Sequence, residues 1–248
     1  MTVINTWNET NLHNTLKKIY AGEFNGQTEQ KSGSFICDIL TPEEIIEIQT
    51  GSVSALKKKI EYFINQGKKI RVVHPVIEEK IIKTVTETGE LLSSKKSPKS
   101  ETPYASLQGL TGVYSSIKNN LFTLELIGVS ITEIRIKKEE KTQLPNKSRR
   151  FLKDWIPGGK QLNKINWSKK YHTLSDYLSF LPPSLPEDFT PPELKSLIFN
   201  HPQFIHLSKS NRQKAASTYT LLLWLFCKME IIEKTEEKKG KSWIYHLK

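Results

Sequence analysis

The sequence predicts an α/β protein in which a mixed-sheet core is followed by a mainly helical module. Short runs rich in β-branched residues lie at 34–40 and 45–50, and a third lies at 69–76 beyond an amphipathic helix. From residue 174 the pattern changes to apolar residues at helical spacing, followed by two short strand-like runs. These observations indicate the order α-β-β-α-β for the first part, and helix, helix, hairpin for the last.

The core begins with a short helix over 11–21, because its apolar residues recur on one face. Residues 26–33 are polar and rich in turn formers, so we expect a turn there. The runs 34–40 and 45–50 are then two strands. The tight turn at 41–44 between them predicts that they pair antiparallel.

A helix follows the strand pair. Ser52 or Ser54 can cap it, an apolar stripe runs along it, and Gly67 ends it. The strand at 69–76 comes directly after this helix. A strand, a helix and a second strand in this order predict a parallel crossover, and therefore a mixed sheet covered by helices.

The next elements extend the sheet. Residues 80–97 indicate a hairpin that turns at Gly89, and residues 121–136 form another strand. We therefore place the core domain at 1–140. The segment 141–171 begins with charged and polar residues, so we expect it to be a basic, exposed connection.

The last module covers 172–248. Thr190 is a good N-cap for one helix, and a second helix should begin near Ser210 and run to Lys228. Two short strands follow, with a lysine-rich tip around Gly240 between them. The module therefore has the order helix, turn, helix, two-stranded hairpin.

Positive charge is concentrated in the second half of the chain. The 248 residues carry a net charge of +11. Residues 1–140 hold 18 Lys and Arg against 17 Asp and Glu, whereas residues 141–248 hold 19 against 9. A surplus of this kind favours a polyanionic partner, because phosphates that are neutralised by the protein release their counterions. A generically basic protein surface is the alternative.

The sequence also bears on the cellular compartment. The longest apolar run is too short to span a membrane, and the N-terminus lacks the pattern of a secretory signal. Cys37 and Cys227 lie in apolar stretches without the spacing of a zinc site. We therefore expect reduced, buried thiols in a cytoplasmic protein.

Acidic residues interrupt the apolar strands of the core. Glu47 and Gln49 are two residues apart on one strand, so their side chains share a face. Asp38 lies on the preceding strand, where pairing brings its carboxylate close to that of Glu47. Burying two unpaired carboxylates is costly, and a divalent cation would compensate their charge. A hairpin with solvent-facing acids is the alternative interpretation.

This arrangement resembles the PD-(D/E)XK nuclease superfamily, the fold of many restriction endonucleases and Holliday junction resolvases. The resemblance covers about residues 11–76 and implies a metal-dependent DNA nuclease with Asp38, Glu47 and Gln49 as catalytic residues. It also implies that Asp38, Glu47 and the backbone carbonyl of Ile48 bind Mg²⁺ or Mn²⁺, which would activate the attacking water. Most members have Lys at the position of Gln49, whereas this chain has the Glu-x-Gln form.

The last module resembles a winged helix-turn-helix, in which the second helix of the motif enters the major groove of DNA. This resemblance implies base contacts from the start of that helix and phosphate contacts from the wing. The residues that it assigns to double-stranded DNA are Asn211, Arg212, Gln213, Lys214, Thr218, Lys238, Lys239 and Lys241. Arg149 and Arg150 would add contacts to the DNA backbone. A protein-interaction module or a helical cap on the core is the alternative.

Taken together, these interpretations predict a DNA endonuclease, with a restriction or defence role and a homodimeric state like that of many duplex-cutting enzymes. A DNA-binding regulator that has lost catalysis, with Gln49 as the sign of that loss, is the second interpretation. A repair or recombination nuclease for branched DNA is the third. His13 and Glu29 are candidate accessory residues, although each is typical of a surface or packing position.

Overall fold

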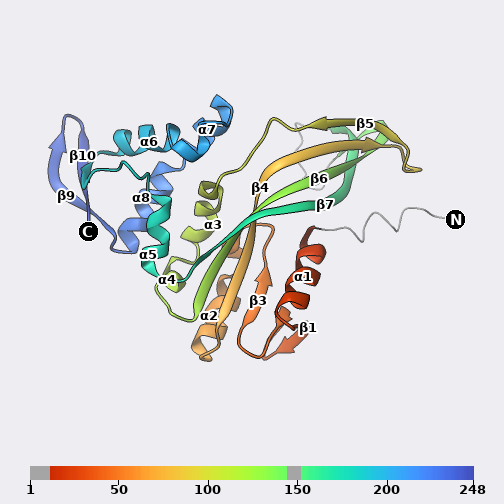
Figure 1. Ribbon diagram of the computed structural model, residues 1–248, viewed down its shortest axis with the longest axis horizontal. Helices are drawn as coiled ribbons and strands as arrows, with labels where there is room; N and C mark the ends of the chain where they lie inside the picture. Colours follow the sequence, from red (N-terminus) through yellow and green to blue (C-terminus); the bar gives the residue numbers. More distant parts are fainter. Residues whose placement is uncertain (1–11, 144–151) are drawn as a thin grey trace.

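The computed structural model describes residues 12–143 and 152–248 (Figure 1). Within these residues, seven strands form one mixed sheet in the order β1-β2-β3-β4-β6-β7, with β5 paired to β4. The strands are β1 (Gln27–Ser32), β2 (Phe35–Leu40), β3 (Ile45–Ile48), β4 (Ile70–Val85), β5 (Leu91–Lys96), β6 (Phe122–Gln143) and β7 (Leu152–Tyr171). The long strands β4, β6 and β7 continue beyond the body of the molecule as an arm (Figure 1).

The sheet is mixed because its connections differ in length. β1, β2 and β3 are joined by short turns and pair antiparallel. β3 and β4 pair parallel, with Ile45 opposite Ile70, because the helix α2 (Lys57–Asn65) and the short turn η2 (Val53–Leu56) connect them. β4 and β6 are also parallel, and β6 and β7 are antiparallel. The predicted helix α1 (Leu12–Glu23), the strand pair β2–β3, the helix α2 and the strand β4 are all present, but β1 stands between α1 and β2, so the order is α-β-β-β-α-β.

The structure corrects two expectations about this region. The predicted turn at 26–33 is largely β1, an edge strand that pairs with β2 from Ser32 opposite Phe35. The predicted connection at 141–171 is largely β7, which pairs with β6 along most of its length. Both strands are edge strands with many exposed polar side chains, so their composition is that of a loop. Pairing with an apolar neighbour makes them strands.

Two apolar cores lie on opposite faces of the sheet. The smaller core joins α1 to Ile39, Ile46 and Ile48. The larger core joins α2 to Cys37 and Ile45, and continues into the helices of the last module. The chain after residue 172 therefore packs against the sheet and shares its main core.

The elements between β5 and β6, and those after β7, are mostly short helices. The first group is η3 (Pro103–Ser106), α3 (Leu107–Thr111) and α4 (Tyr114–Ile117). The second group is α5 (Leu174–Tyr177), η4 (Leu178–Phe180), β8 (Asp188–Phe189), α6 (Pro191–Phe199), η5 (Pro202–Phe204), α7 (Lys209–Ala216), α8 (Tyr219–Lys228), β9 (Ile232–Lys239) and β10 (Ser242–Leu247). A separate sheet of order β8-β10-β9 adds one short strand to the predicted hairpin.

The last module confirms one predicted helix and corrects another. Thr190 precedes α6 as expected, and its backbone N–H donates to the Glu193 carboxylate at 2.8 Å, as in a capping box. The single helix predicted from Ser210 to Lys228 is instead two, α7 and α8. Between them, the hydroxyls of Ser217 and Thr218 donate back to carbonyls of the preceding turn. Such bonds compete with the helical ladder and favour a break.

Two further expectations concern membrane-spanning helices and the state of the two cysteines. Among the helices that the structure describes, none has the length and apolar character needed to cross a membrane. Cys37 is buried and Cys227 is half-buried, and both are free thiols. Each is part of, or packs against, the larger core.

Candidate functional site

The junction of β2 and β3 brings Asp38 and Glu47 together, as the sequence predicts. The paired register of the two strands ends with Ile39 opposite Ile46, and Asp38 and Glu47 are the next residues beyond this pair. The Asp38 N–H donates to Oε1 of Glu47 at 3.2 Å, and the Ile48 N–H donates to Oδ2 of Asp38 at 2.9 Å. Each carboxylate therefore takes the place of a backbone carbonyl in the ladder between the strands.

The two carboxylates nevertheless turn toward different helices. Asp38 accepts a bond from His13 Nε2 of α1 at 3.1 Å, and Lys17 Nζ of α1 lies 3.7 Å from its Oδ1. Glu47 accepts a bond from Lys59 Nζ of α2 at 2.5 Å. Because α1 and α2 cover opposite faces of the sheet, the acids lie toward opposite faces. This differs from the expected arrangement, in which they share one cation.

The surroundings of these two acids shift their pKa values in different directions. The hydrogen bond with Asp38 raises the pKa of His13, against the effect of burial. Burial would raise the pKa of Asp38, but the bonds from His13 and the Ile48 N–H lower it overall. Burial raises the pKa of Glu47 more than Lys59 lowers it. The His13–Asp38 contact is therefore an ion pair below the raised His13 pKa, whereas the charge of Glu47 depends on Lys59.

Gln49 follows the last residue of β3. Its side-chain oxygen accepts a bond from the Gly51 N–H at 3.0 Å, which folds the amide onto its own turn. Its backbone carbonyl accepts a bond from His74 Nδ1 on β4 at 2.7 Å. Burial lowers the pKa of His74, so the neutral ring is the donor in this contact. His74 thus fixes the end of β3, which is a structural role.

Two lysines complete the site, and sequence reasoning missed both. Lys59 also donates to the Ile36 carbonyl at 2.6 Å, so its ammonium joins α2 to β2 and β3. Lys17 contacts Glu29 as well as Asp38, which brings the accessory candidate Glu29 to the site. In the sequence, Lys59 is the last of three consecutive lysines, a pattern that normally indicates a solvated helix face.

The donor atoms at this junction have the chemistry of a hard-cation site. Two carboxylates and a backbone carbonyl are the oxygen ligands that Mg²⁺ prefers. Within residues 12–143 and 152–248, however, no three His, Cys, Asp or Glu side chains converge as a metal cluster would require. A cation bound here would have Asp38, Glu47 and the Ile48 carbonyl as protein ligands, and the Glu47 carboxylate would have to part from Lys59.

Comparison with known proteins assigns the region that contains this site. Residues 10–171 match a family described as a domain of unknown function (DUF8091). The chain belongs to this family. A protein of Treponema pallidum (strain Nichols), described as an uncharacterized protein, is 26% identical over 134 residues, which cover 54% of this chain and 53% of that protein. The chain thus aligns with about half the length of this relative. No solved structure matches the chain significantly.

The matched DUF8091 region ends before the residues assigned to the second helix of the winged motif. Asn211 is buried, and its amide donates to the Pro98 carbonyl at 3.0 Å. The guanidinium of Arg212 lies 4.6 Å from the ring centre of Phe199. Both side chains therefore hold α7 within the molecule. Gln213 and Lys214 are exposed, and Thr218 closes the turn after α7.

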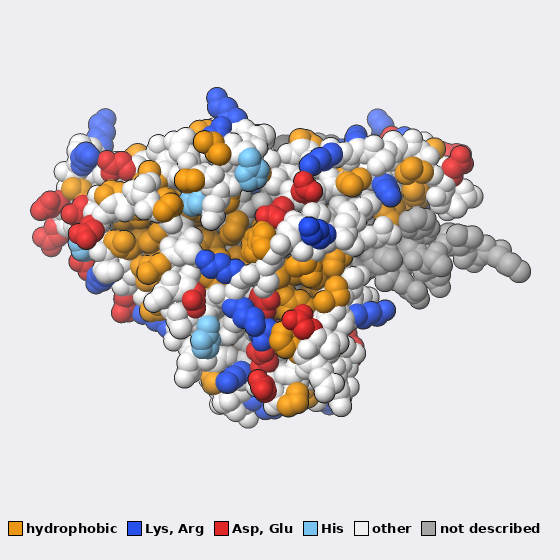
Figure 2. Space-filling model, in the orientation of Figure 1, with side chains coloured by type: hydrophobic (Ala, Val, Ile, Leu, Met, Phe, Trp, Pro, Cys, Tyr) orange, Lys and Arg blue, Asp and Glu red, His pale blue; other side chains and the backbone are white. Residues whose placement is uncertain are grey.

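The lysines predicted for a wing are exposed, and two of them contact other side chains of the chain. Lys238 lies 4.1 Å from the ring centre of Trp243, and Lys239 pairs with Glu193 at 2.8 Å. Lys241 is exposed next to the turn. Arg149 and Arg150 lie outside the residues that the structure describes. On the face shown in Figure 2, lysines and arginines are interspersed with acids and form no single basic patch.

Proposed function

We propose that this protein is a divalent-metal-dependent nuclease that hydrolyses phosphodiester bonds in double-stranded DNA. The observation that carries the proposal is the hydrogen-bonded meeting of Asp38 and Glu47 at the β2–β3 junction, in a core with the order α1-β1-β2-β3-α2-β4. The elements from β2 to β4 follow the order that the resemblance to PD-(D/E)XK nucleases implies, with β1 as an additional strand. The net charge of +11 favours a polyanionic substrate.

Lys59 supplies a charged group that the sequence motif lacks. Gln49 stands where most members of the superfamily have Lys, and an amide is neither a charged stabiliser nor a general base. The ammonium of Lys59 reaches Glu47 from α2 instead. We infer that Lys59 provides positive charge beside the scissile phosphate, while Gln49 orients water by hydrogen bonding.

The proposed metal ligands are Asp38, Glu47 and the backbone carbonyl of Ile48. A divalent ion held by these groups would supply a bound water of lowered pKa and positive charge for the phosphate. The chain's own groups have separate tasks. His13 and the Ile48 N–H hold the Asp38 carboxylate in place, and Lys59 lowers the pKa of Glu47 against the effect of its burial.

Cleavage of supercoiled plasmid DNA tests this proposal. We expect cleavage with Mg²⁺ or Mn²⁺ by the full chain, and a loss of at least roughly 100-fold in Asp38→Asn and Glu47→Gln. Glu43→Gln is the matched control, because Glu43 is exposed in the turn between the same strands. Calorimetric titration with Mn²⁺ gives a readout that is independent of activity. Cleavage that persists in both variants would contradict the assignment.

A second candidate is a DNA-binding regulator with a nuclease-like core and no catalysis. The observation that favours it is the orientation of the two acids, which pair with lysines on opposite faces of the sheet. For this candidate we expect duplex binding without cleavage in Mg²⁺ or Mn²⁺. We also expect Asp38→Asn to leave the DNA dissociation constant unchanged, as measured by fluorescence anisotropy.

A further inference from the structure

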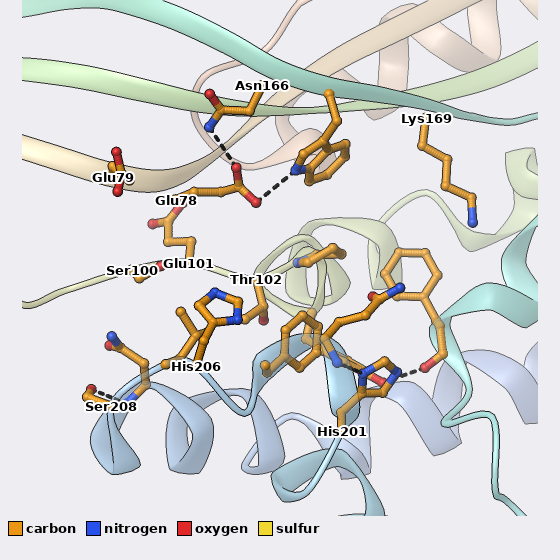
Figure 3. A pocket seen from close by; sticks show the side chains of 18 of the residues that line it. Glu78, Glu79, Ser100, Glu101, Thr102, Asn166, Lys169, His201, His206 and Ser208 are labelled. Carbon is orange, nitrogen blue, oxygen red and sulfur yellow. Dashed lines mark hydrogen bonds between the residues drawn. The ribbon is translucent and has the colours of Figure 1, made fainter.

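A large cavity lies between the sheet and the helices of the last module, away from the β2–β3 junction (Figure 3). Its volume is about 1080 Å³. Its walls come from the segment around β4 and β5, from the end of β7, and from residues 179–211. Cavities that bind small organic ligands have volumes of roughly 300–1,000 Å³, so this cavity has room for a ligand of nucleotide size or larger. The DUF8091 match ends at 171, so two structural regions build the cavity together.

One wall of the cavity is aromatic and rigid. The rings of Tyr104, Phe180, His201 and Phe204 contact one another, with His201 stacked on Phe204 at 4.7 Å between centres. The Tyr104 hydroxyl donates to the Phe180 carbonyl at 2.7 Å, which fixes the ring that contacts the other three. Because these rings are almost fully buried, they form a rigid, partly apolar boundary of the cavity, which favours a partly apolar ligand.

Two carboxylates that face the cavity keep an uncompensated charge. Glu78 accepts bonds from the neutral groups of Trp167 and Asn166 at 2.7 and 2.8 Å. Glu101 accepts a bond from the Ile77 N–H at 3.1 Å. Among the described residues, neither acid has a Lys, Arg or His nitrogen within ion-pair distance. Both are half-buried, so each is a strong acceptor for N–H groups of a ligand.

A positive group faces the same space from another wall. The side chain of Lys169, on β7, extends into the cavity in Figure 3, on the side away from Glu101. Its nearest ring contact is Tyr171, at 5.4 Å from the ring centre. The cavity therefore offers N–H acceptors on one side and a cation on the other, with an aromatic wall nearby.

We propose that this cavity binds a nucleotide with an amino-substituted base. The base would lie against the aromatic wall, its amino group would donate to Glu101 or Glu78, and its phosphate would pair with Lys169. Other ligands fit less well. The positive charge of a polyamine or of a lysine side chain would be repelled by Lys169, and a free amino acid would fill only a small part of the cavity. The base can belong to a free nucleotide or to a nucleic-acid strand, since the recognised chemistry is the same. The site goes beyond the proposed nuclease function and does not depend on it.

Isothermal titration of the full chain in EDTA tests the proposal without cleavage. We expect dCMP and dAMP to bind, and dTMP, which lacks an exocyclic amine, to bind roughly tenfold or more weakly. Glu101→Gln keeps the shape of the side chain and its acceptor for the Ile77 N–H, but removes the charge. It should weaken dCMP binding by roughly tenfold or more and leave dTMP nearly unchanged. Glu90→Gln, exposed in the turn before β5, is the matched control.

Two further measurements test the contact to the phosphate and the source of the base. Lys169→Met should weaken dCMP but not deoxycytidine. A single-stranded oligo(dC) that competes with dCMP would identify a strand as a source, and oligo(dC) that does not compete would identify a free nucleotide. The proposal is overturned if no mononucleotide binds, if Glu101→Gln and Glu90→Gln behave alike, or if spermidine displaces dCMP. Loss of plasmid cleavage leaves these measurements unaffected, so the two proposals fail separately.

Discussion

Replacing Lys59 by methionine should destabilise the protein strongly, because it leaves Glu47 buried without a counter-charge. The Glu47 side chain is 3% exposed and that of Lys59 is 12% exposed, at 2.5 Å from each other. Breaking a buried pair by removing one partner costs about 3–5 kcal/mol. For a chain of this size each kcal/mol lowers the melting temperature by about 2–4 °C, so we expect a fall of roughly 6–20 °C.

The size of this loss should depend on pH in a definite direction. Burial raises the pKa of Glu47 above its usual 4.5, against the effect of Lys59. A carboxyl with a raised folded-state pKa favours folding below its unfolded pKa, and this contribution is lost as the pH rises through the folded value. Removing Lys59 raises the pKa of Glu47 further. The cost of Lys59→Met should therefore be largest at neutral pH and shrink as Glu47 is protonated.

Urea unfolding followed by circular dichroism measures this effect. The double variant that carries both Glu47→Gln and Lys59→Met should be more stable than the single variant Lys59→Met at neutral pH, because it no longer buries the charge of Glu47. Lys58→Met is the matched control, since Lys58 is exposed on the same helix. A loss below about 1 kcal/mol, or one that does not change with pH, would refute the buried pair.

Three further predictions follow from single contacts. His13→Ala should lower the free energy of unfolding by about 1 kcal/mol near pH 6 and by less near pH 9. The raised pKa of His13 makes its bond to Asp38 an ion pair, which is lost as the pH rises. Equal losses at both pH values in urea unfolding would contradict this. Gly128→Ala should cost about 1–3 kcal/mol and shift tryptophan fluorescence, because a Cβ there would lie 2.1 Å from Nε1 of Trp167; an unchanged melting temperature would count against this packing. If the last module contacts DNA, Lys214→Ala should reduce the slope of log K against log salt by about 1, measured by fluorescence anisotropy, and an unchanged slope would remove Lys214 from the interface.

The lysine partners of the two acids matter for choosing between catalysis and binding. An ammonium beside each carboxylate satisfies the charge that a cation would otherwise balance. A nuclease must therefore exchange the Glu47–Lys59 contact for a metal contact when it loads. A regulator would retain the pair under all conditions. The response of Lys59→Met to Mn²⁺ separates these cases, because a metal-binding site should regain stability from the ion whereas a purely structural pair should not.

Much of the fold could be predicted because its signals are local. Apolar residues at strand spacing, the turn at 41–44 and the helix before 69–76 imply the meander and the parallel crossover, and the structure contains both. β1 and β7 could not be predicted, because an edge strand carries polar side chains like those of a loop. The break between α7 and α8 was missed because residues 210–228 lack the glycine or proline that usually marks one.

The candidate site was predicted only in its position along the chain. Pairing of the two strands brings Asp38 to Glu47, as expected from the turn between them. The partners Lys17 and Lys59 were not foreseen, because each comes from a helix whose packing against the sheet is a long-range property. The same reason explains Asn211, whose amide faces Pro98 instead of an external partner.

The sequence by itself determined the antiparallel pair β2–β3, the parallel crossover to β4, the nearness of Asp38 to Glu47 and the excess of positive charge, since periodicity, turns and composition are read along the chain. Only the tertiary structure decided that the two carboxylates turn to opposite faces, that Lys59 is half-buried while Lys57 and Lys58 are exposed, and that a cavity lies between the sheet and the last helices. The physical reason is that the environment of a side chain depends on which distant elements pack against it, and no local pattern specifies those elements.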